Sequence, residues 1–133
     1  MAVPTAPTVL NHALIVKDRS GPKAYWLTAT MYTMGRSPRN NIRIDSEYVS
    51  RHHAILVRIP SVKGGYSYQV LDGDSEGNPS TNGVFVNGKK VDFHDLKNGD
   101  EIRLSSDSSA TYLLTEKTLD FILSTYERTQ LLG

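Results

Sequence analysis

The sequence predicts an all-β protein built as a sandwich of two sheets, and two observations support that prediction. Short runs rich in β-branched and aromatic residues recur along the chain, separated by Gly, Pro, Asn and Asp turn signals. In the longest runs the apolar residues alternate, as they do in a strand that buries one face. Many short strands joined by tight turns favour a sandwich over an alternating α/β fold.

The strand-like runs occupy the middle of the chain, from Ala13 to Thr115. In residues 53–59, every second side chain counted from His53 is expected to share one strand face. In residues 66–70, positions 66, 68 and 70 are expected to share a face of the next strand. The expected strands are Ala13–Lys17, Ala24–Thr28, Met31–Met34, Ile42–Ile44, His53–Ile59, Tyr66–Leu71, Val84–Val86, Lys89–Val91, Glu101–Leu104 and Thr111–Thr115.

A tight hairpin and a terminal helix complete the expected elements. Asn87-Gly88 separates two short runs and predicts a hairpin, because both residues tolerate the positive φ of a type I′ turn. Apolar residues at 119, 122, 123 and 126 follow helical spacing, which predicts a helix over about 117–130 packed on the sandwich. The chain is therefore divided into a flexible lead-in (1–12), a sandwich domain (13–116) and a C-terminal helical extension (117–133).

The composition indicates the class of protein, the partners to exclude and the cellular compartment. A length of 133 residues leaves room for one modest core, and an apolar content of 38% is too high for a disordered tail. A formal net charge of +1 argues against a nucleic-acid partner, because such binders usually carry a clear basic excess. The absence of cysteine fits a reducing compartment. No apolar run or signal peptide points to a membrane, so the sequence predicts a cytoplasmic protein.

Four polar motifs lie at turns between the expected strands. Side chains on turns do not build a core, so their grouping on one small frame suggests a shared surface site. They supply an arginine, hydroxyl groups and an asparagine amide, which are the groups that hold a phosphate by charge and directed hydrogen bonds. The motifs are Gly35-Arg36-Ser37, Ser50-Arg51-His52-His53, Ser80-Thr81-Asn82-Gly83 and Val86-Asn87-Gly88.

The strand order brings some of these motifs together. The strand at 53–59 runs away from Ser50 and the strand at 66–71 returns, so the loop at 72–82 reaches the rim where Ser50 lies. Arg36 is separated from Ser50 by the expected strand at 42–44, which is only about 10 Å long. Such a short segment is able to run along the rim. Strand counting therefore permits Arg36 to join the site but does not require it.

These motifs, in this order and followed by Leu96-Lys97-Asn98-Gly99-Asp100-Glu101-Ile102, resemble a forkhead-associated (FHA) domain over residues 14–116. The resemblance implies a sandwich of about eleven strands that binds phosphothreonine peptides through loops at one end. It also implies a binding module rather than an enzyme, with no cofactor. The expected function is an adaptor that binds Thr-phosphorylated partners downstream of a Ser/Thr kinase.

The resemblance also implies a role for each matched residue. Arg36 would grip the phosphate, Ser50 would donate its hydroxyl to a phosphate oxygen, and Asn82 would hold the main chain of the peptide. Arg51 would touch the phosphate or the peptide backbone, and Thr81 would help bind the phosphate. The residues implied as structural support are Gly35, His53, Gly83, Asn87 and Gly88.

Two features of the chain differ from the family pattern or vary within it. The loop Asp72–Ser80 is longer and more acidic than the family pattern suggests, which could alter specificity. Selectivity beyond the phosphothreonine is expected from variable loop residues, here Tyr48 and Ser105–Ser109.

Three other interpretations of the sequence compete with a phosphopeptide-binding module. One casts Ser50 and His53 as nucleophile and base, oriented by Asp45 or Asp72. The sequence has no Gly-x-Ser-x-Gly elbow, so a buried, hydrogen-bonded His53 is the better interpretation. The Asp72 loop resembles the start of a calcium loop, yet Gly83 stands where a bidentate Glu is needed, so no metal is expected. The alternative function is a phospho-independent interaction or oligomerisation scaffold of the same fold.

Overall fold

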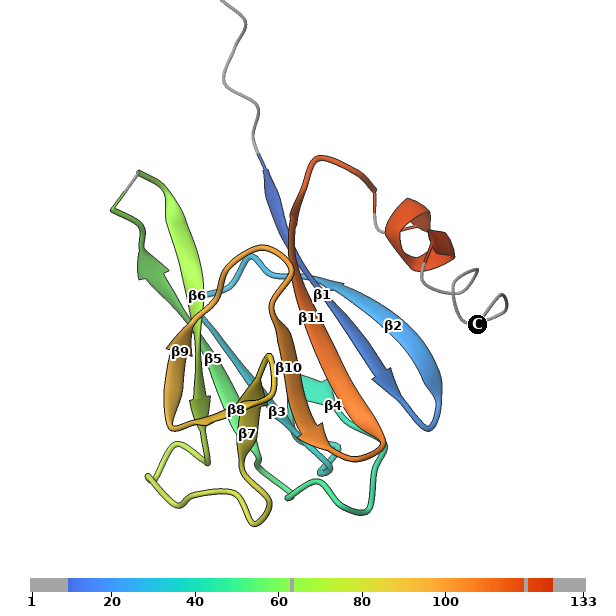
Figure 1. The fold of residues 1–133 in the computed structure, drawn as a ribbon, viewed down its shortest axis with the longest axis vertical. Coiled ribbons are helices and arrows are strands. Elements are labelled where there is room, and N and C mark those ends of the chain that lie inside the picture. Colours follow the sequence, from blue (N-terminus) through green and yellow to red (C-terminus); the bar gives the residue numbers. More distant parts are fainter. Residues whose placement is uncertain (1–9, 63, 119, 126–133) are drawn as a thin grey trace, which may run out of the picture.

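The computed structural model describes residues 10–62, 64–118 and 120–125, and it shows a sandwich of two β-sheets (Figure 1). The expected all-β class is confirmed, and each of the ten expected strand ranges overlaps an observed strand. The strands of the described residues are β1 (Asn11–Asp18), β2 (Gly21–Trp26), β3 (Met31–Gly35), β4 (Ile42–Arg43), β5 (Ala54–Pro60), β6 (Tyr66–Asp72), β7 (Val84–Val86), β8 (Lys89–Val91), β9 (Phe93–Asp95), β10 (Glu101–Ser105) and β11 (Ser108–Thr115).

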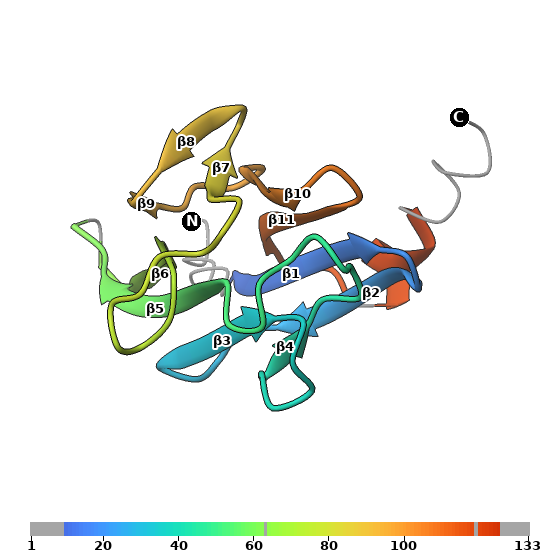
Figure 2. The ribbon, with the colours of Figure 1, turned by 90° about the horizontal axis from the view of Figure 1, so that it is seen from below.

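The two sheets face each other, and Figure 2 views them from the end that carries the long loops. One sheet has six strands in the order β2-β1-β11-β10-β7-β8, and the other has five in the order β4-β3-β5-β6-β9. Neighbouring strands pair antiparallel, except that β3 and β4 are parallel. The β7–β8 hairpin turns at Asn87 and Gly88, whose φ angles of 50° and 86° are both positive, as the sequence predicts.

The core lies between the sheets and draws side chains from both. The largest fully buried members on the β1, β10 and β11 side are Leu14, Ile102 and Tyr112, while Leu56 and Tyr68 come from β5 and β6. Burial of side chains of this size is the main stabilising contribution, at about 1.5–3 kcal/mol each. The core therefore supports a rigid frame beneath the loops.

The C-terminal segment packs on the outer face of the six-stranded sheet. Residues 120–125 are helical, and the helix begins where the Thr118 hydroxyl accepts the Phe121 N–H at 3.2 Å, an N-terminal cap. Ile122 is buried against Ala13 and Ile15 of β1. The expected helix is thus present over these residues, and its remaining part at 126–130 lies outside the described residues. Within the described part of the chain, no helix is long and apolar enough to cross a membrane.

The strands differ from the expected ones at two places. β9 was not anticipated, because Phe93 is 65% exposed and this edge strand has no alternating apolar pattern, so its pairing with β6 rests on backbone hydrogen bonds. The strand expected at 53–59 begins one residue later, at Ala54, and of its first three residues Ala54 and Leu56 belong to the core between the sheets, whereas Ile55 does not. His53 is buried as expected and directly precedes β5.

Parallel pairing of β3 and β4 brings the polar loops to one end. Met34 pairs with Ile42 and Gly35 with Arg43, so both strands run in the same direction and finish at the same edge. The segment after β3, which starts at Arg36, and the loop after β4, which contains Ser50, therefore start close together. Figure 1 shows these loops at the lower end of the sandwich, with the β6–β7 and β10–β11 connections.

Candidate functional site

Arg36 lies where the segment after β3 meets the loop after β4. Its backbone N–H donates to the Ser50 carbonyl at 3.0 Å, and its Nε donates to the Val49 carbonyl at 3.1 Å. The Arg36 side chain is exposed, and within the described residues it forms no ion pair with a carboxylate. The Nε bond fixes the direction of the guanidinium, while its two terminal nitrogens keep their donors for a ligand. A fixed fork of this kind suits a tetrahedral anion.

Ser50 lies in the β4–β5 loop and links that loop to the β6–β7 loop. The backbone N–H of Thr81 donates to Ser50 Oγ at 3.0 Å. Because the oxygen accepts this bond, the hydroxyl proton is available to a second acceptor. The neighbouring Asn82 donates from Nδ2 to the Tyr48 carbonyl at 2.6 Å. The structure therefore brings Arg36, Ser50, Thr81 and Asn82 together, and we call these four residues the loop-end site.

His53 links the β4–β5 loop, which carries Ser50, to the β6–β7 loop, which carries Gly83. The Ser50 N–H donates to His53 Nδ1 at 3.0 Å, so Nδ1 accepts and the proton must be on Nε2, which donates to the Gly83 carbonyl at 2.7 Å. Burial lowers the pKa of His53 below its ordinary value of 6.5, which favours the neutral ring that this arrangement needs. The imidazole thus holds the Ser50 turn and the Asn82-Gly83 turn at a fixed separation.

The same contacts argue against catalysis by Ser50 and His53. Both ring nitrogens of His53 are engaged by backbone groups, at Ser50 and Gly83. Neither nitrogen is left to take a proton from the Ser50 hydroxyl, which a general base must do. For a metal, the described residues contain no group of three or more His, Asp or Glu side chains placed to hold an ion.

Gly35 stands where the chain leaves β3 and has no room for a side chain. A Cβ at this position would lie 2.2 Å from the carbonyl oxygen of Arg51 and 2.9 Å from Nδ2 of Asn40. Asn40 is buried and donates from Nδ2 to the Arg51 carbonyl at 2.6 Å and to the Ser37 carbonyl at 2.9 Å. Sequence reasoning missed Asn40, because an asparagine in a turn is ordinarily read as a turn former.

Arg51 directly follows Ser50 in the β4–β5 loop. Its guanidinium is exposed, and no hydrogen bond within the described residues joins it to the loop-end site. Its backbone is well held, because its carbonyl accepts bonds from Asn40 and from the Ser37 N–H. The backbone of Arg51 is therefore fixed, and its exposed guanidinium adds positive charge next to Ser50.

The acidic β6–β7 loop folds around its own carboxylates. Asp74 Oδ1 accepts the N–H groups of Glu76 and Asn78 at 3.0 and 2.9 Å, and hydrogen bonds from Asn78 lower the pKa of Asp74. At the end of the loop, the Ser80 hydroxyl donates to Asp72 and accepts the Gly83 N–H at 2.9 Å. The additional length thus forms a compact turn that sets the position of Thr81 and Asn82.

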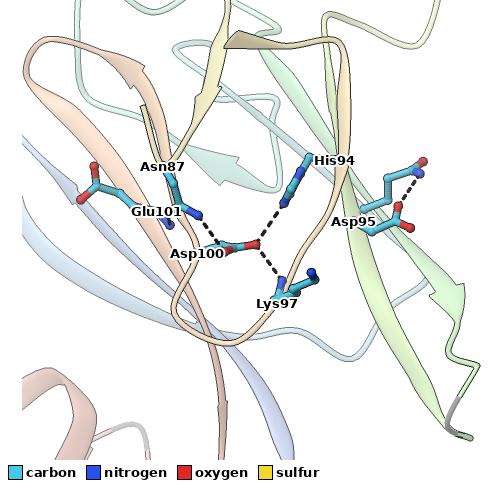
Figure 3. Close-up of polar contacts among 7 residues, drawn as sticks. Asn87, His94, Asp95, Lys97, Asp100 and Glu101 are labelled. Atoms are coloured by element: carbon cyan, nitrogen blue, oxygen red, sulfur yellow. Dashed lines mark hydrogen bonds and ion pairs between the residues drawn. The ribbon is translucent and has the colours of Figure 1, made fainter. Parts of the chain in front are cut away.

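Asp100 organises the loops behind the β7–β8 hairpin, as Figure 3 shows. Its Oδ1 accepts from Asn87 Nδ2 at 2.9 Å, and its Oδ2 accepts the Lys97 N–H at 2.8 Å and lies 3.2 Å from His94 Nε2. Asn87 in turn accepts the Glu101 N–H at 2.9 Å. These contacts explain why Asn87 and the Leu96–Ile102 motif occur together. The role of Asp100 itself was not anticipated.

Asp100 makes stability depend on pH. Burial acts to raise its pKa, but the bonds from Lys97, Asn87 and His94 outweigh it and place the pKa below 3.8. A carboxylate with a depressed folded pKa stabilises the protein above its unfolded pKa, and this contribution is lost as pH falls through the folded value. We expect Asp100→Asn to lower the free energy of unfolding by about 1–3 kcal/mol at neutral pH.

Urea denaturation near neutral pH and in acid checks this expectation. The difference between wild type and Asp100→Asn should shrink as the pH is lowered below 3.8. Asp95→Asn is the matched control, because Asp95 is exposed and contacts Gln69 (Figure 3). A difference that stays constant over this range would show that the Asp100 charge is not the source of the stabilisation.

Comparison with known proteins places these features in a family. The family model described as the FHA domain matches residues 32–105, which include the whole loop-end site. The Slr1951 protein from Synechocystis, a solved structure, is 47% identical, with a TM-score of 0.73, and the match covers 77% of this chain and 96% of that one.

Two further matches carry more descriptive names. Mycobacterium tuberculosis EmbR, solved in complex with a low-affinity phosphopeptide, is 30% identical with a TM-score of 0.60, over 80% of this chain and 25% of EmbR. The glycogen accumulation regulator GarA of Mycolicibacterium smegmatis is 37% identical over 95 residues, or 69% of this chain. The chain spans 53% of GarA and 14% of another curated relative it matches.

Proposed function

This chain belongs to the FHA family, and on that premise we propose that it binds proteins and peptides phosphorylated on threonine. The observation that carries the proposal is the hydrogen-bonded loop-end site. Arg36, Ser50, Thr81 and Asn82 come from three loops, and bonds between Arg36, Ser50 and Thr81 hold those loops together. The proposed role is that of a phosphopeptide-binding adaptor in Ser/Thr-kinase signalling.

The groups of the loop-end site match the chemistry of a phosphate. A phosphate monoester carries about −1.5 to −2 charges and three acceptor oxygens. The free nitrogens of Arg36 supply charge and a fork of donors, and the Ser50 hydroxyl supplies a directed donor. Arg51 adds positive potential without a fixed contact. In this scheme Thr81 completes the phosphate contacts and Asn82 holds the main chain of the peptide.

The loops are already held in place before a ligand arrives. Ser50, Thr81 and Gly83 are fixed by bonds to one another and to His53. Ordering of loops opposes binding, because it lowers conformational entropy. Here the loops are already ordered in the folded protein, so binding a ligand loses less entropy. Three or four charge-assisted bonds, less desolvation, then correspond to a dissociation constant of about a micromolar.

The relatives support this assignment by their own descriptions. EmbR has been solved with a phosphopeptide, and GarA is named a regulator. An adaptor role for this chain would place its ligand downstream of a Ser/Thr kinase. Recognition of phosphorylated motifs by arginine is an established mode of peptide binding.

Titration calorimetry with matched peptides tests the proposal. A peptide chosen from a degenerate phosphothreonine library should bind with a dissociation constant of about a micromolar, and its unphosphorylated twin should give no measurable heat. Equal binding of both forms would favour the alternative of a phospho-independent scaffold, as would a pull-down that phosphatase does not weaken.

A further inference from the structure

The longest open edge among the described strands belongs to β2, at one side of the six-stranded sheet (Figure 1). β2 has six residues and, within the described strands, pairs with β1 alone. The other edge strands, β4, β8 and β9, have two or three residues each, and β8 also carries Lys89 and Lys90, whose charges oppose pairing with a further strand. β2 is therefore the edge best suited to extend the sheet with a strand from another chain.

The backbone groups of Pro22, Ala24 and Trp26 point to this open edge. Opposite residues of an antiparallel pair alternate between pairs that exchange hydrogen bonds and pairs that do not. The Leu27 N–H donates to the His12 carbonyl at 2.8 Å, so these two residues form a bonded pair. Counting back along β2 from Leu27, residues 26, 24 and 22 fall in the unbonded pairs with β1. The count agrees with Pro22, which has no N–H to donate to β1.

We infer that two copies of this chain pair through β2, in antiparallel direction, with Ala24 of one copy opposite Ala24 of the other. In this register each Ala24 N–H donates to the Ala24 carbonyl of the other copy, and each Trp26 N–H donates to the Pro22 carbonyl of the other copy. Pro22 has no N–H to return to the Trp26 carbonyl, but that carbonyl already accepts from the Tyr32 hydroxyl at 3.4 Å. The open edge of β2 is thus complementary to itself.

The side chains of β2 favour the same register. It places Lys23 of one copy opposite Tyr25 of the other, and a cation next to an aromatic ring is a favourable cross-strand pair. A shift by two residues in one direction would set Lys23 opposite Lys23, and like charges directly opposite destabilise a sheet. A shift in the other direction would pair residues 24–26 of β2 rather than 22–26. The proposed register therefore pairs most of β2 without opposing like charges.

The resulting dimer is weak and has a defined shape. Pairing through one short strand gives a smaller interface than the roughly 1,200–2,000 Å² of stable complexes, so we expect a dissociation constant on the order of 10–100 μM. Because the paired strands are antiparallel, the two loop-end sites lie at opposite ends of the joined sheet. The inference does not depend on phosphate binding at those sites.

Sedimentation equilibrium at protein concentrations from about 1 to 500 μM tests the dimer. The wild-type mass should rise from that of a monomer to that of a dimer. Ala24→Pro should remain monomeric and keep the circular dichroism spectrum of the wild type, because the N–H that it loses points away from β1. A monomeric wild type, or an Ala24→Pro variant that still dimerises, would overturn the inference.

Lys90→Pro on β8, the opposite edge of the same sheet, is the matched control. Val86 and Lys89 close the two-residue turn as a bonded pair, so Lys90 and Phe85 form an unbonded pair and the Lys90 N–H also points outward. This variant should dimerise as the wild type does. A loss of dimer equal to that of Ala24→Pro would contradict pairing through β2.

A cysteine variant checks the register without a proline. The sequence contains no cysteine, so Ala24→Cys introduces a single thiol. In the proposed dimer the two Cα atoms at this position are about 5.5 Å apart, a separation that a disulfide spans. Oxidation should therefore cross-link Ala24→Cys on a non-reducing gel. Lys23→Cys, whose position faces Tyr25 of the other copy, should cross-link about tenfold less. Equal cross-linking of the two variants would overturn the proposed register and the dimer with it.

Discussion

Arg36→Ala should abolish phosphopeptide binding while leaving the fold intact. The guanidinium is exposed, its single fixed contact is to the Val49 carbonyl, and its backbone N–H bond to Ser50 does not depend on the side chain. Each charge-assisted bond to the phosphate contributes about 1.5–3 kcal/mol, so loss of two corresponds to a fall in affinity of at least about 100-fold. The melting temperature should change by no more than about 2 °C, as for other exposed substitutions.

Two companion variants sharpen this experiment. Arg58→Ala removes an exposed arginine from β5, near the opposite end of the sandwich, and should leave the affinity within about twofold of wild type. Arg36→Lys keeps the positive charge but loses the fork, so its affinity should fall between those of wild type and Arg36→Ala. If Arg36→Ala binds as wild type does, the phosphate lies elsewhere.

His53→Ala should cause the largest loss of stability and should weaken binding with it. His53 is fully buried, and its removal leaves the Ser50 N–H and the Gly83 carbonyl without partners, at about 1–3 kcal/mol each, and also creates a cavity. We expect the free energy of unfolding to fall by about 3 kcal/mol or more, and the melting temperature by roughly 10 °C.

The adjacent histidine offers a matched control. His52 is exposed and contacts Asn40 at 3.1 Å, so His52→Ala should cost less than about 1 kcal/mol. Chemical denaturation of the two variants gives the comparison, and calorimetry at a temperature where both are folded gives the affinity. Similar losses in the two variants would contradict the role of His53 as the link between the loops.

The sequence predicted the sandwich and most strands because turn signals and alternating apolar runs are local features. β9 was missed because it carries no such pattern and is held by backbone pairing to β6. Alternation alone did not show which face of β5 turns to the core, because Ile55 looks as suitable for the core as Leu56. Both sides of that strand are partly covered, so apolar residues occur on each face.

The candidate site was predictable as a set of residues but not as a geometry. Strand counting left the place of Arg36 open, and the parallel pairing of β3 with β4 explains why it lies beside Ser50. A parallel pair joined by a short loop has no sequence signature comparable to that of a hairpin.

The supporting contacts were the least predictable part. Asp100 and Asp107 both accept bonds from residues distant in sequence, such as Asn87 and Ser46. Each aspartate lies in a loop where a solvated carboxylate is the ordinary interpretation. Only the fold brings their partners together, so no spacing rule could have identified them.

An NMR titration of the ¹⁵N-labelled protein with one phosphothreonine peptide tests most directly whether the loop-end site holds the phosphate. The largest shift changes should fall on the Arg36 side-chain NεH and on the backbone amides of Ser50, Thr81 and Asn82, and the unphosphorylated twin should produce none. Changes centred on Ile122 and the outer face of β1, with the Arg36 signal unmoved, would contradict the proposed site.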